Sequence, residues 1–159
     1  MPFSRVTAES DSAPGSLPLL LGLAGLIPFL ATAALAWWGP LAWQVVAISA
    51  FLYYSAVILS FLGGVQWGVA MSLEPADSAG FKRRLLLSMV PSLIAWPALL
   101  LHPYSGAWVL AAGFLLVRLH EAGRDSRELQ PDWYQTLRTL LTVVVVACHG
   151  VVIWRLSSG

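Results

Sequence analysis

Long apolar runs separated by short polar breaks make up the chain from residue 17 onward. The first run, Leu17 to Trp38, contains no charged residue and ends at Gly39-Pro40, and a second run continues from Leu41 to Leu73. Because a helix needs about 20 apolar residues to cross the ~30 Å hydrocarbon core of a bilayer, each run predicts a membrane helix. The second run is too long for a straight crossing, so we expect it to tilt, bend or protrude, with Gly63-Gly64 as the bend.

Three shorter apolar runs follow, bounded by polar segments and prolines. A polar stretch over residues 74–84 precedes the first, His102-Pro103 separates the first from the second, and residues 120–130 form a polar loop before the last. The predicted spans are residues 17–38, 45–72, 85–101, 104–119 and 134–155. Residues 85–119 have two interpretations, because a re-entrant hairpin returns to the same side of the membrane as two full spans do.

This pattern predicts an all-α integral membrane bundle of about five transmembrane helices, built from a single domain over residues 17–156. Residues 1–16 are polar and contain several Ser, so we expect a disordered cytoplasmic tail. A cleaved signal peptide is the alternative for the first run, since Ala34-Leu35-Ala36 has the small residues of a cleavage site. The length of the run favours an uncleaved spanning helix.

Composition supports lipid as the main solvent of the chain. Charged residues make up 11% of it, against about a quarter in soluble domains. The 13 Gly and 8 Trp suit membrane helices and their interfaces with water. A net charge of +1 gives no reason to expect a nucleic-acid partner, and a single cysteine excludes an internal disulfide.

Basic residues are divided unequally when the five spans are threaded in alternate directions. One side carries Arg5, Lys82, Arg83, Arg84, Arg118, Arg124, Arg127 and Arg138, and the other carries Arg155 alone. By the positive-inside rule we expect the N-terminus in the cytoplasm and the C-terminus outside, in a bacterial inner membrane. The cluster of Lys82, Arg83 and Arg84 is expected to set this orientation and to meet lipid headgroups.

The sequence lacks the patterns that catalysis and metal binding would need. No Asp or Glu falls inside a predicted span, and no hydrolase, zinc-protease or nucleotide-binding motif occurs. We therefore predict no catalytic residue, no metal site and no cofactor. His149 is an ionisable residue within a span, and haem or quinone binding there would need a second group at the same depth. A neutral, hydrogen-bonded His149 is the favoured interpretation.

The segment from Tyr53 to Gly68 is the richest in candidate residues. Its small residues give the candidates for helix packing: Ala56, Ser60, Gly63, Gly64 and Gly68. Small residues at this spacing are typical of close contacts between membrane helices. The alternative is a polar cavity lined by Ser55, Gln66 and His149, and Gln66 needs a hydrogen-bond partner in either case.

Four strings of the chain together resemble a known family. They are GLAGLIPF from Gly22 to Phe29, YSAVILSFLGGVQWG from Tyr54 to Gly68, Pro91-Ser92-Leu93, and WYQTLRTLLT from Trp133 to Thr142. The family is an uncharacterised one of small bacterial inner-membrane proteins with a mitochondrial multi-span transmembrane relative in eukaryotes. The resemblance implies an all-helical fold in an energy-transducing membrane, and it carries no activity, cofactor or catalytic residue.

Three hypotheses for function follow. The first is a non-enzymatic membrane protein that packs as a homo-oligomer or with a membrane complex and assists its assembly or stability. The second is a small carrier or pore for a neutral or lipophilic solute. The third is a subunit that binds quinone or haem. Membrane lipid is a partner in all three.

Overall fold

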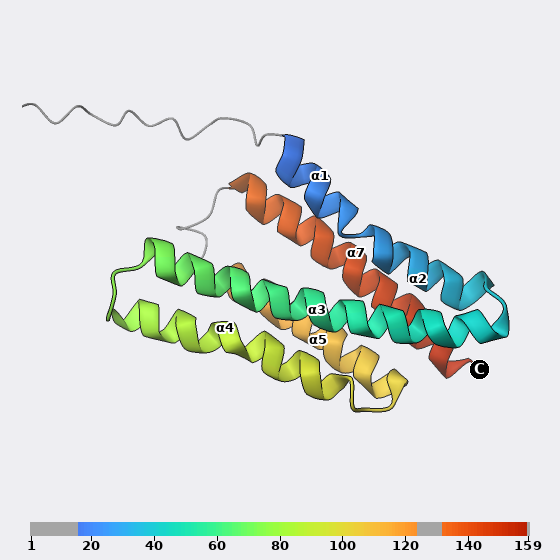
Figure 1. The fold of residues 1–159 in the computed structure, drawn as a ribbon. Coiled ribbons are helices and arrows are strands. Elements are labelled where there is room, and N and C mark those ends of the chain that lie inside the picture. Colours follow the sequence, from blue (N-terminus) through green and yellow to red (C-terminus); the bar gives the residue numbers. More distant parts are fainter. Residues whose placement is uncertain (1–15, 124–131, 159) are drawn as a thin grey trace, which may run out of the picture.

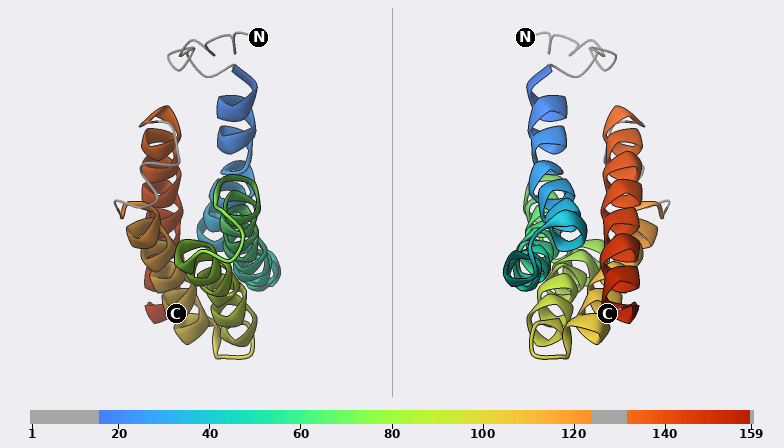
Figure 2. Two further views of the ribbon diagram at one scale, coloured as in Figure 1. Left: turned by 90° about the vertical axis from the view of Figure 1, so that its left-hand side faces the viewer. Right: turned by 90° about the vertical axis from the view of Figure 1, so that its right-hand side faces the viewer.

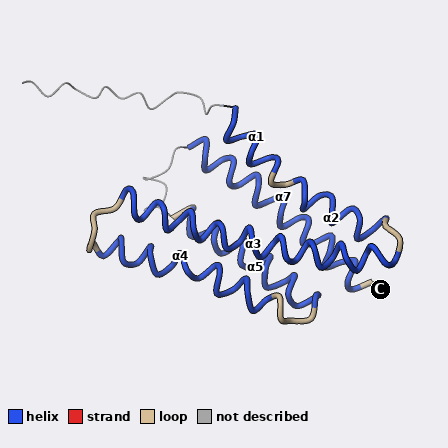
Figure 3. The backbone as a smooth tube through the Cα atoms, viewed as in Figure 1, coloured by secondary structure: helices blue, strands red, loops and turns tan. Residues whose placement is uncertain are grey.

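The computed structural model describes residues 16–123 and 132–158, and this part of the chain forms helices joined by short loops and turns (Figures 1 and 3). Its helices are α1 (Ser16–Ala24), α2 (Ile27–Trp38), α3 (Leu41–Leu73), α4 (Ala79–Ala98), α5 (Pro103–Glu121) and α7 (Asp132–Ser157). The predicted disordered tail over residues 1–16 lies outside the described residues except for Ser16, which begins α1.

The helices form one bundle in which α2, α3, α4, α5 and α7 run in alternate directions, and α1 runs in the same direction as α2 (Figures 1 and 2). The α3 and α4 helices form an antiparallel pair, and α5 packs against both of them. The α7 helix packs against α5 and α2, and α2 also packs against α3. Three stretches of the described chain are long and apolar enough to cross a membrane: Ser16–Trp38, Leu41–Leu73 and Asp132–Ser157. The all-α membrane bundle is confirmed, whereas full crossings by α4 and α5 stay a prediction.

The centre and the outside of the bundle are both apolar. Phe29, Phe51 and Phe114 come from three different helices and are at most 2% exposed, and their rings meet edge to face. Large apolar side chains also cover the outside; Trp38, for example, is 84% exposed. A continuous apolar exterior of this kind is what a lipid-facing surface requires.

The first apolar run is divided into two helices, although the sequence predicts one. Pro28 lacks the N–H that would bond to the carbonyl of Ala24, and its ring crowds that carbonyl, so the chain turns at Gly25 and Leu26. Tyr54 repairs part of the break, because its hydroxyl donates a 3.0 Å hydrogen bond to the carbonyl of Gly25.

The long α3 helix is continuous across Gly63-Gly64, where the sequence analysis expects a bend. Gly63 instead marks the place where α4 comes closest. A Cβ atom at this position would clash with the backbone carbonyl oxygen of Ser88. The missing side chain at Gly63 is therefore used for helix packing, and the backbone hydrogen bonds of α3 stay intact.

The α4 and α5 helices are longer at their charged ends than predicted. Ser78 accepts a hydrogen bond from the backbone N–H of Phe81 and starts α4 one turn or more before the predicted residue 85. The α5 helix continues to Glu121, beyond the predicted end at residue 119. Both extensions move charged residues from predicted loops into helices.

Described basic residues gather at one end of the bundle. Lys82, Arg83 and Arg84 lie in the first turns of α4, Arg118 in the last turn of α5 and Arg138 near the start of α7. Figure 1 shows that these helix ends lie together, opposite the end that carries the C-terminus and Arg155. The sequence analysis predicts the orientation in the membrane from this same division of basic residues between the two ends.

Candidate functional site

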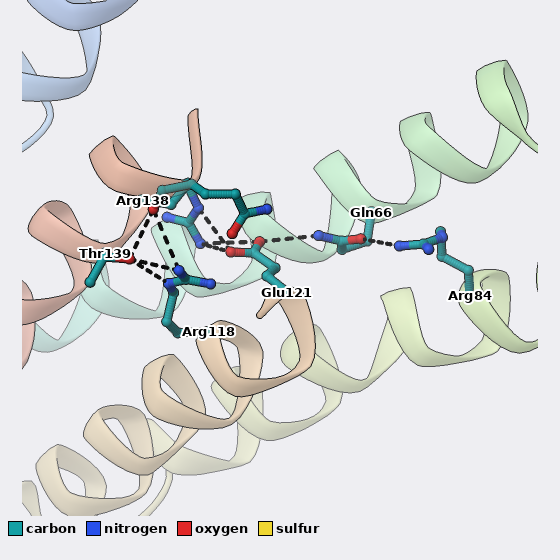
Figure 4. Close-up of polar contacts among 7 residues, drawn as sticks. Gln66, Arg84, Arg118, Glu121, Arg138 and Thr139 are labelled. Carbon is teal, nitrogen blue, oxygen red and sulfur yellow. Dashed lines mark hydrogen bonds and ion pairs between the residues drawn. The ribbon is translucent and has the colours of Figure 1, made fainter. Parts of the chain in front are cut away.

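Gln66 lies at the centre of a buried cluster of polar side chains at the charged end of the bundle (Figure 4). It comes from α3 and is 3% exposed. Its side-chain Nε2 donates to Oε1 of Glu121 at 3.1 Å, and its Oε1 accepts from Nη1 of Arg84 at 3.0 Å. Both ends of the amide are thus bonded to charged side chains of the protein.

Glu121 and Arg138 form the inner ion pair of this cluster. Glu121 is the last residue of α5 and is fully buried. Arg138 of α7 donates from Nε to Oε2 at 3.1 Å and from Nη2 to Oε1 at 3.2 Å. Two parallel bonds between a guanidinium and a carboxylate fix both position and orientation, so this pair holds α5 and α7 in register.

Arg84 and Glu74 form the outer ion pair. The Nε of Arg84 donates to Oε1 of Glu74 at 2.6 Å, and both side chains are largely shielded from solvent. Glu74 is the residue directly after α3, and Arg84 lies in the second turn of α4. The pair therefore ties the two helices together across their short connection.

The polar cluster of Glu74, Arg84, Gln66, Glu121 and Arg138 joins α3, α4, α5 and α7. It contains two carboxylates and two guanidiniums, so its formal charges cancel. A buried ion pair repays its desolvation only when its geometry is good and its remaining polar atoms are bonded. Removal of one partner would leave an uncompensated charge in an apolar surrounding, which makes the cluster a strong constraint on how the helices meet.

The structure places two charged residues of the cluster elsewhere than the sequence analysis expects. The sequence analysis expects Glu121 in a polar loop outside the predicted spans, yet it is the last residue of α5 and is fully buried. The sequence analysis groups Arg84 with Lys82 and Arg83 as an orientation and headgroup residue, but Arg84 is 5% exposed and is bonded to Glu74 and Gln66. Lys82 and Arg83 are exposed, as a role at the headgroups would require.

Each of the predicted polar-cavity residues has contacts of its own within the bundle. Gln66 belongs to the polar cluster, whereas the hydroxyl of Ser55 donates to the carbonyl of Phe51 at 2.7 Å, one turn earlier on α3. His149 is fully buried, and its ring centroid lies 4.7 Å from that of Phe51 and 5.6 Å from that of Phe114. Its Nδ1 lies 2.8 Å from the carbonyl of Val145. The ring is thus held by its own helix and by aromatic neighbours.

The predicted packing residues divide between the inside and the outside of the bundle. Ala56 and Gly63 are buried and Ser60 is half-buried, whereas Gly64 and Gly68 are exposed. A Cβ atom added at either exposed glycine would have no neighbour within 4 Å among the described residues. The two exposed glycines therefore leave an open strip on the outer face of α3.

Within the described chain, no three His, Cys, Asp or Glu side chains are placed to hold a metal ion. Cys148 is buried and free. The groups that could act chemically are instead the paired charges of the polar cluster, and each is bonded to another protein group.

Comparison with known proteins gives a consistent result over most of the chain. Residues 15–154 match a family model described as a protein of unknown function (DUF3429). Transmembrane protein 69 of Xenopus tropicalis is 42% identical over 136 residues, which cover 80% of this chain and 50% of the relative. Transmembrane protein 69 of Mus musculus is 32% identical over 146 residues, which cover 89% of this chain and 56% of the relative.

The chain spans about half the length of the curated relatives it matches. No solved structure matches it significantly. The matches confirm the predicted resemblance to an uncharacterised family with a eukaryotic transmembrane relative, while the bacterial origin stays a prediction. On the extent of the family match, this chain belongs to the DUF3429 family of membrane proteins, whose function is described as unknown.

Proposed function

We propose that this protein acts by helix packing in the membrane: the outer face of α3 binds a transmembrane helix of a second copy or of a membrane complex, whose assembly or stability it assists. The observation that carries the proposal is the exposed pair Gly64 and Gly68, one turn apart on α3 and open to a Cβ atom. Catalysis has no part in this role.

The sequence explains why the strip of small residues reaches the outside. A repeat of four residues exceeds the 3.6 residues of a helical turn and drifts by about 40° at each step. Ala56 is therefore buried, Ser60 is half-buried, and Gly64 and Gly68 are exposed. The inner half of the strip serves the bundle itself, and the outer half is left for a partner.

The surroundings of the two glycines suit a helix partner. Phe61 is 63% exposed and Met71 is 60% exposed, so large apolar side chains flank the open strip. In lipid, helices gain no hydrophobic free energy by meeting, and association depends on close van der Waals packing at small residues. Large side chains beside a strip of glycines form ridges and a groove, and the side chains of a partner helix can pack into that groove.

The experiment is co-isolation from native membranes in mild detergent, followed by mass measurement of the intact complex. The wild-type protein is expected as an oligomer or with a stoichiometric partner. Gly64→Leu with Gly68→Leu should release that partner while the monomer keeps its helical content. Gly150→Leu is the matched control, because Gly150 is also exposed and open but lies on α7. A wild-type protein that is a clean monomer would refute the proposal.

The orientation is proposed on the same basis as before: the end that carries Lys82 and Arg83 faces the cytoplasm. Its support is the concentration of basic residues at that end of the bundle.

The carrier hypothesis gains no support from Gln66, since both ends of its amide are bonded to protein groups. Its remaining support is an apolar cavity between α1, α2, α3 and α7.

A further inference from the structure

A cavity of about 300 Å³ lies between α1, α2, α3 and α7. Its walls include Gly22 of α1, Phe29 of α2, Phe61 of α3 and Leu141 of α7. The α1 helix contributes to it without packing tightly, because none of its described residues is buried. Figure 2 shows the first turn of α1 apart from the first turn of α7, and the two helices come together where Gly22 faces Leu137 and Leu141.

The lining is apolar and rich in aromatic side chains, with few polar groups. The aromatic residues are Phe29, Phe61, Phe114, Trp133 and Tyr134. Small-molecule sites in proteins have this composition, with a small number of polar groups that fix the orientation of the ligand. The volume falls at the lower end of the roughly 300–1,000 Å³ that such sites occupy.

Thr142 lines the cavity and differs from two other threonines of α7 in its hydrogen bonding. It is 4% exposed, and its hydroxyl has no hydrogen-bond partner among the described residues. Other threonines here bond to the carbonyl one turn earlier: Thr136 to Asp132 at 3.1 Å and Thr139 to Gln135 at 2.8 Å. A buried hydroxyl in apolar surroundings needs a partner, and an acceptor inside the cavity would supply it.

Arg138 lines the same cavity but is already paired. Its Nε and Nη2 atoms donate to the carboxylate of Glu121, so the charge of the guanidinium is compensated within the polar cluster. A ligand with an anionic headgroup would have to compete with that carboxylate. The wall therefore favours a neutral ligand with a hydrogen-bond acceptor.

We propose that this cavity binds a neutral lipophilic molecule that carries a carbonyl oxygen, with the oxygen accepting a hydrogen bond from Thr142 and the apolar body lying against Phe29, Phe61 and Leu141. The ligand enters sideways from the bilayer between α1 and α7. Two sources share this chemistry: an alkylated quinone ring and the acyl ester of a neutral lipid. The site adjoins the outer face of α3, because Phe61 both lines the cavity and flanks the strip of Gly64 and Gly68.

Direct titration of the purified full chain in detergent tests the site. The probes are 2-decyl-1,4-benzoquinone, monodecanoylglycerol and the carbonyl-free decylbenzene, with heat of binding as the readout. At least one carbonyl probe should bind more tightly than decylbenzene, and the tighter of the two identifies the source. Equal affinity for all three probes, or no binding at all, would overturn the proposal.

Variants separate the hydroxyl from the cavity. Thr142→Val should weaken the preferred carbonyl probe by about tenfold and leave decylbenzene unchanged. Thr136→Val is the matched control, because Thr136 is an exposed threonine on the same helix. Gly22→Leu fills the cavity from α1, and Val65→Phe fills it from α3 should the first variant fail to fold. Retention of wild-type affinity in Thr142→Val, or in both folded filling variants, would refute the site.

Discussion

Gln66 and Glu121, 55 residues apart in the chain, are joined by a 3.1 Å hydrogen bond in the interior of the bundle. The bond connects the long α3 helix to the last residue of α5. Because each of the two is also bonded to an arginine, one amide links two ion pairs that would otherwise be separate. The charged end of the bundle is thus held by side chains from four helices.

Glu121→Gln should lower the free energy of unfolding by about 3–5 kcal/mol, because Arg138 would remain buried without a compensating charge. Chemical unfolding in detergent, followed by circular dichroism, measures the loss. Lys82→Met is the control, since the pair of Lys82 and Asp77 is at 3.7 Å with exposed side chains, and such pairs contribute less than about 1 kcal/mol.

The double variant Glu121→Leu with Arg138→Met gives the converse test of the ion pair. It removes both charges while keeping comparable volumes, so it should be more stable than Glu121→Gln alone. If Glu121→Gln itself unfolds like the wild-type protein, the inner ion pair does not hold the helices together.

Neighbouring glycines on α3 should respond in opposite ways to alanine. Gly63→Ala places a Cβ against the backbone carbonyl of Ser88, so α3 and α4 must move apart, at a cost of about 1–3 kcal/mol. Gly64→Ala meets open space and should be neutral or stabilising by up to about 1 kcal/mol through helix propensity. Thermal unfolding of the two variants in the same detergent measures the difference, and equal stabilities would contradict the close approach at Gly63.

The sequence predicts most of the fold because membrane helices are defined by length and hydrophobicity, which a single chain displays directly. The break at Gly25 is harder to predict, since a membrane helix can keep a proline such as Pro28 when neighbours repair the lost bond. The continuity of the α3 helix at Gly63 is also hard to predict from the sequence. A glycine pair is compatible with a bend or with close packing, and the difference depends on α4.

The polar cluster leaves a signal in the sequence that a search for loops overlooks. The buried positions of α4 are Arg84, Ser88, Pro91, Ala95 and Ala98, at the spacing of one helical face. In the same way Glu121 lies one turn after buried Val117, and Arg138 lies one turn before buried Thr142. Each charged residue extends a buried face by one turn. Its inward direction was therefore predictable, whereas its partner on another helix was not.

Tyr54→Phe should destabilise the junction of α1 and α2 by about 1 kcal/mol, because it removes the hydroxyl that bonds to the carbonyl of Gly25. Hydrogen exchange is the sensitive measurement, and the amides near the break at Gly25 and Leu26 should exchange faster than in the wild-type protein. Tyr53→Phe provides the control from the preceding position, because Tyr53 is 60% exposed. Unchanged exchange around Leu26 would show that the Tyr54 hydroxyl does not stabilise the break.

The distribution of charge predicts where the two ends of the bundle lie when the chain is expressed in a bacterial inner membrane. Alkaline phosphatase, which is active outside the cytoplasm, should be active when fused after Gly159 and inactive when inserted after Ala76, in the connection between α3 and α4 of the otherwise full chain. Green fluorescent protein, which folds in the cytoplasm, should give the reverse pattern at the same two positions. The physical reason is that Lys82, Arg83 and the other basic residues of this end resist translocation, whereas Arg155 is the one described basic residue at the far end. Phosphatase activity after Ala76 would place the basic end outside and reverse the proposed orientation.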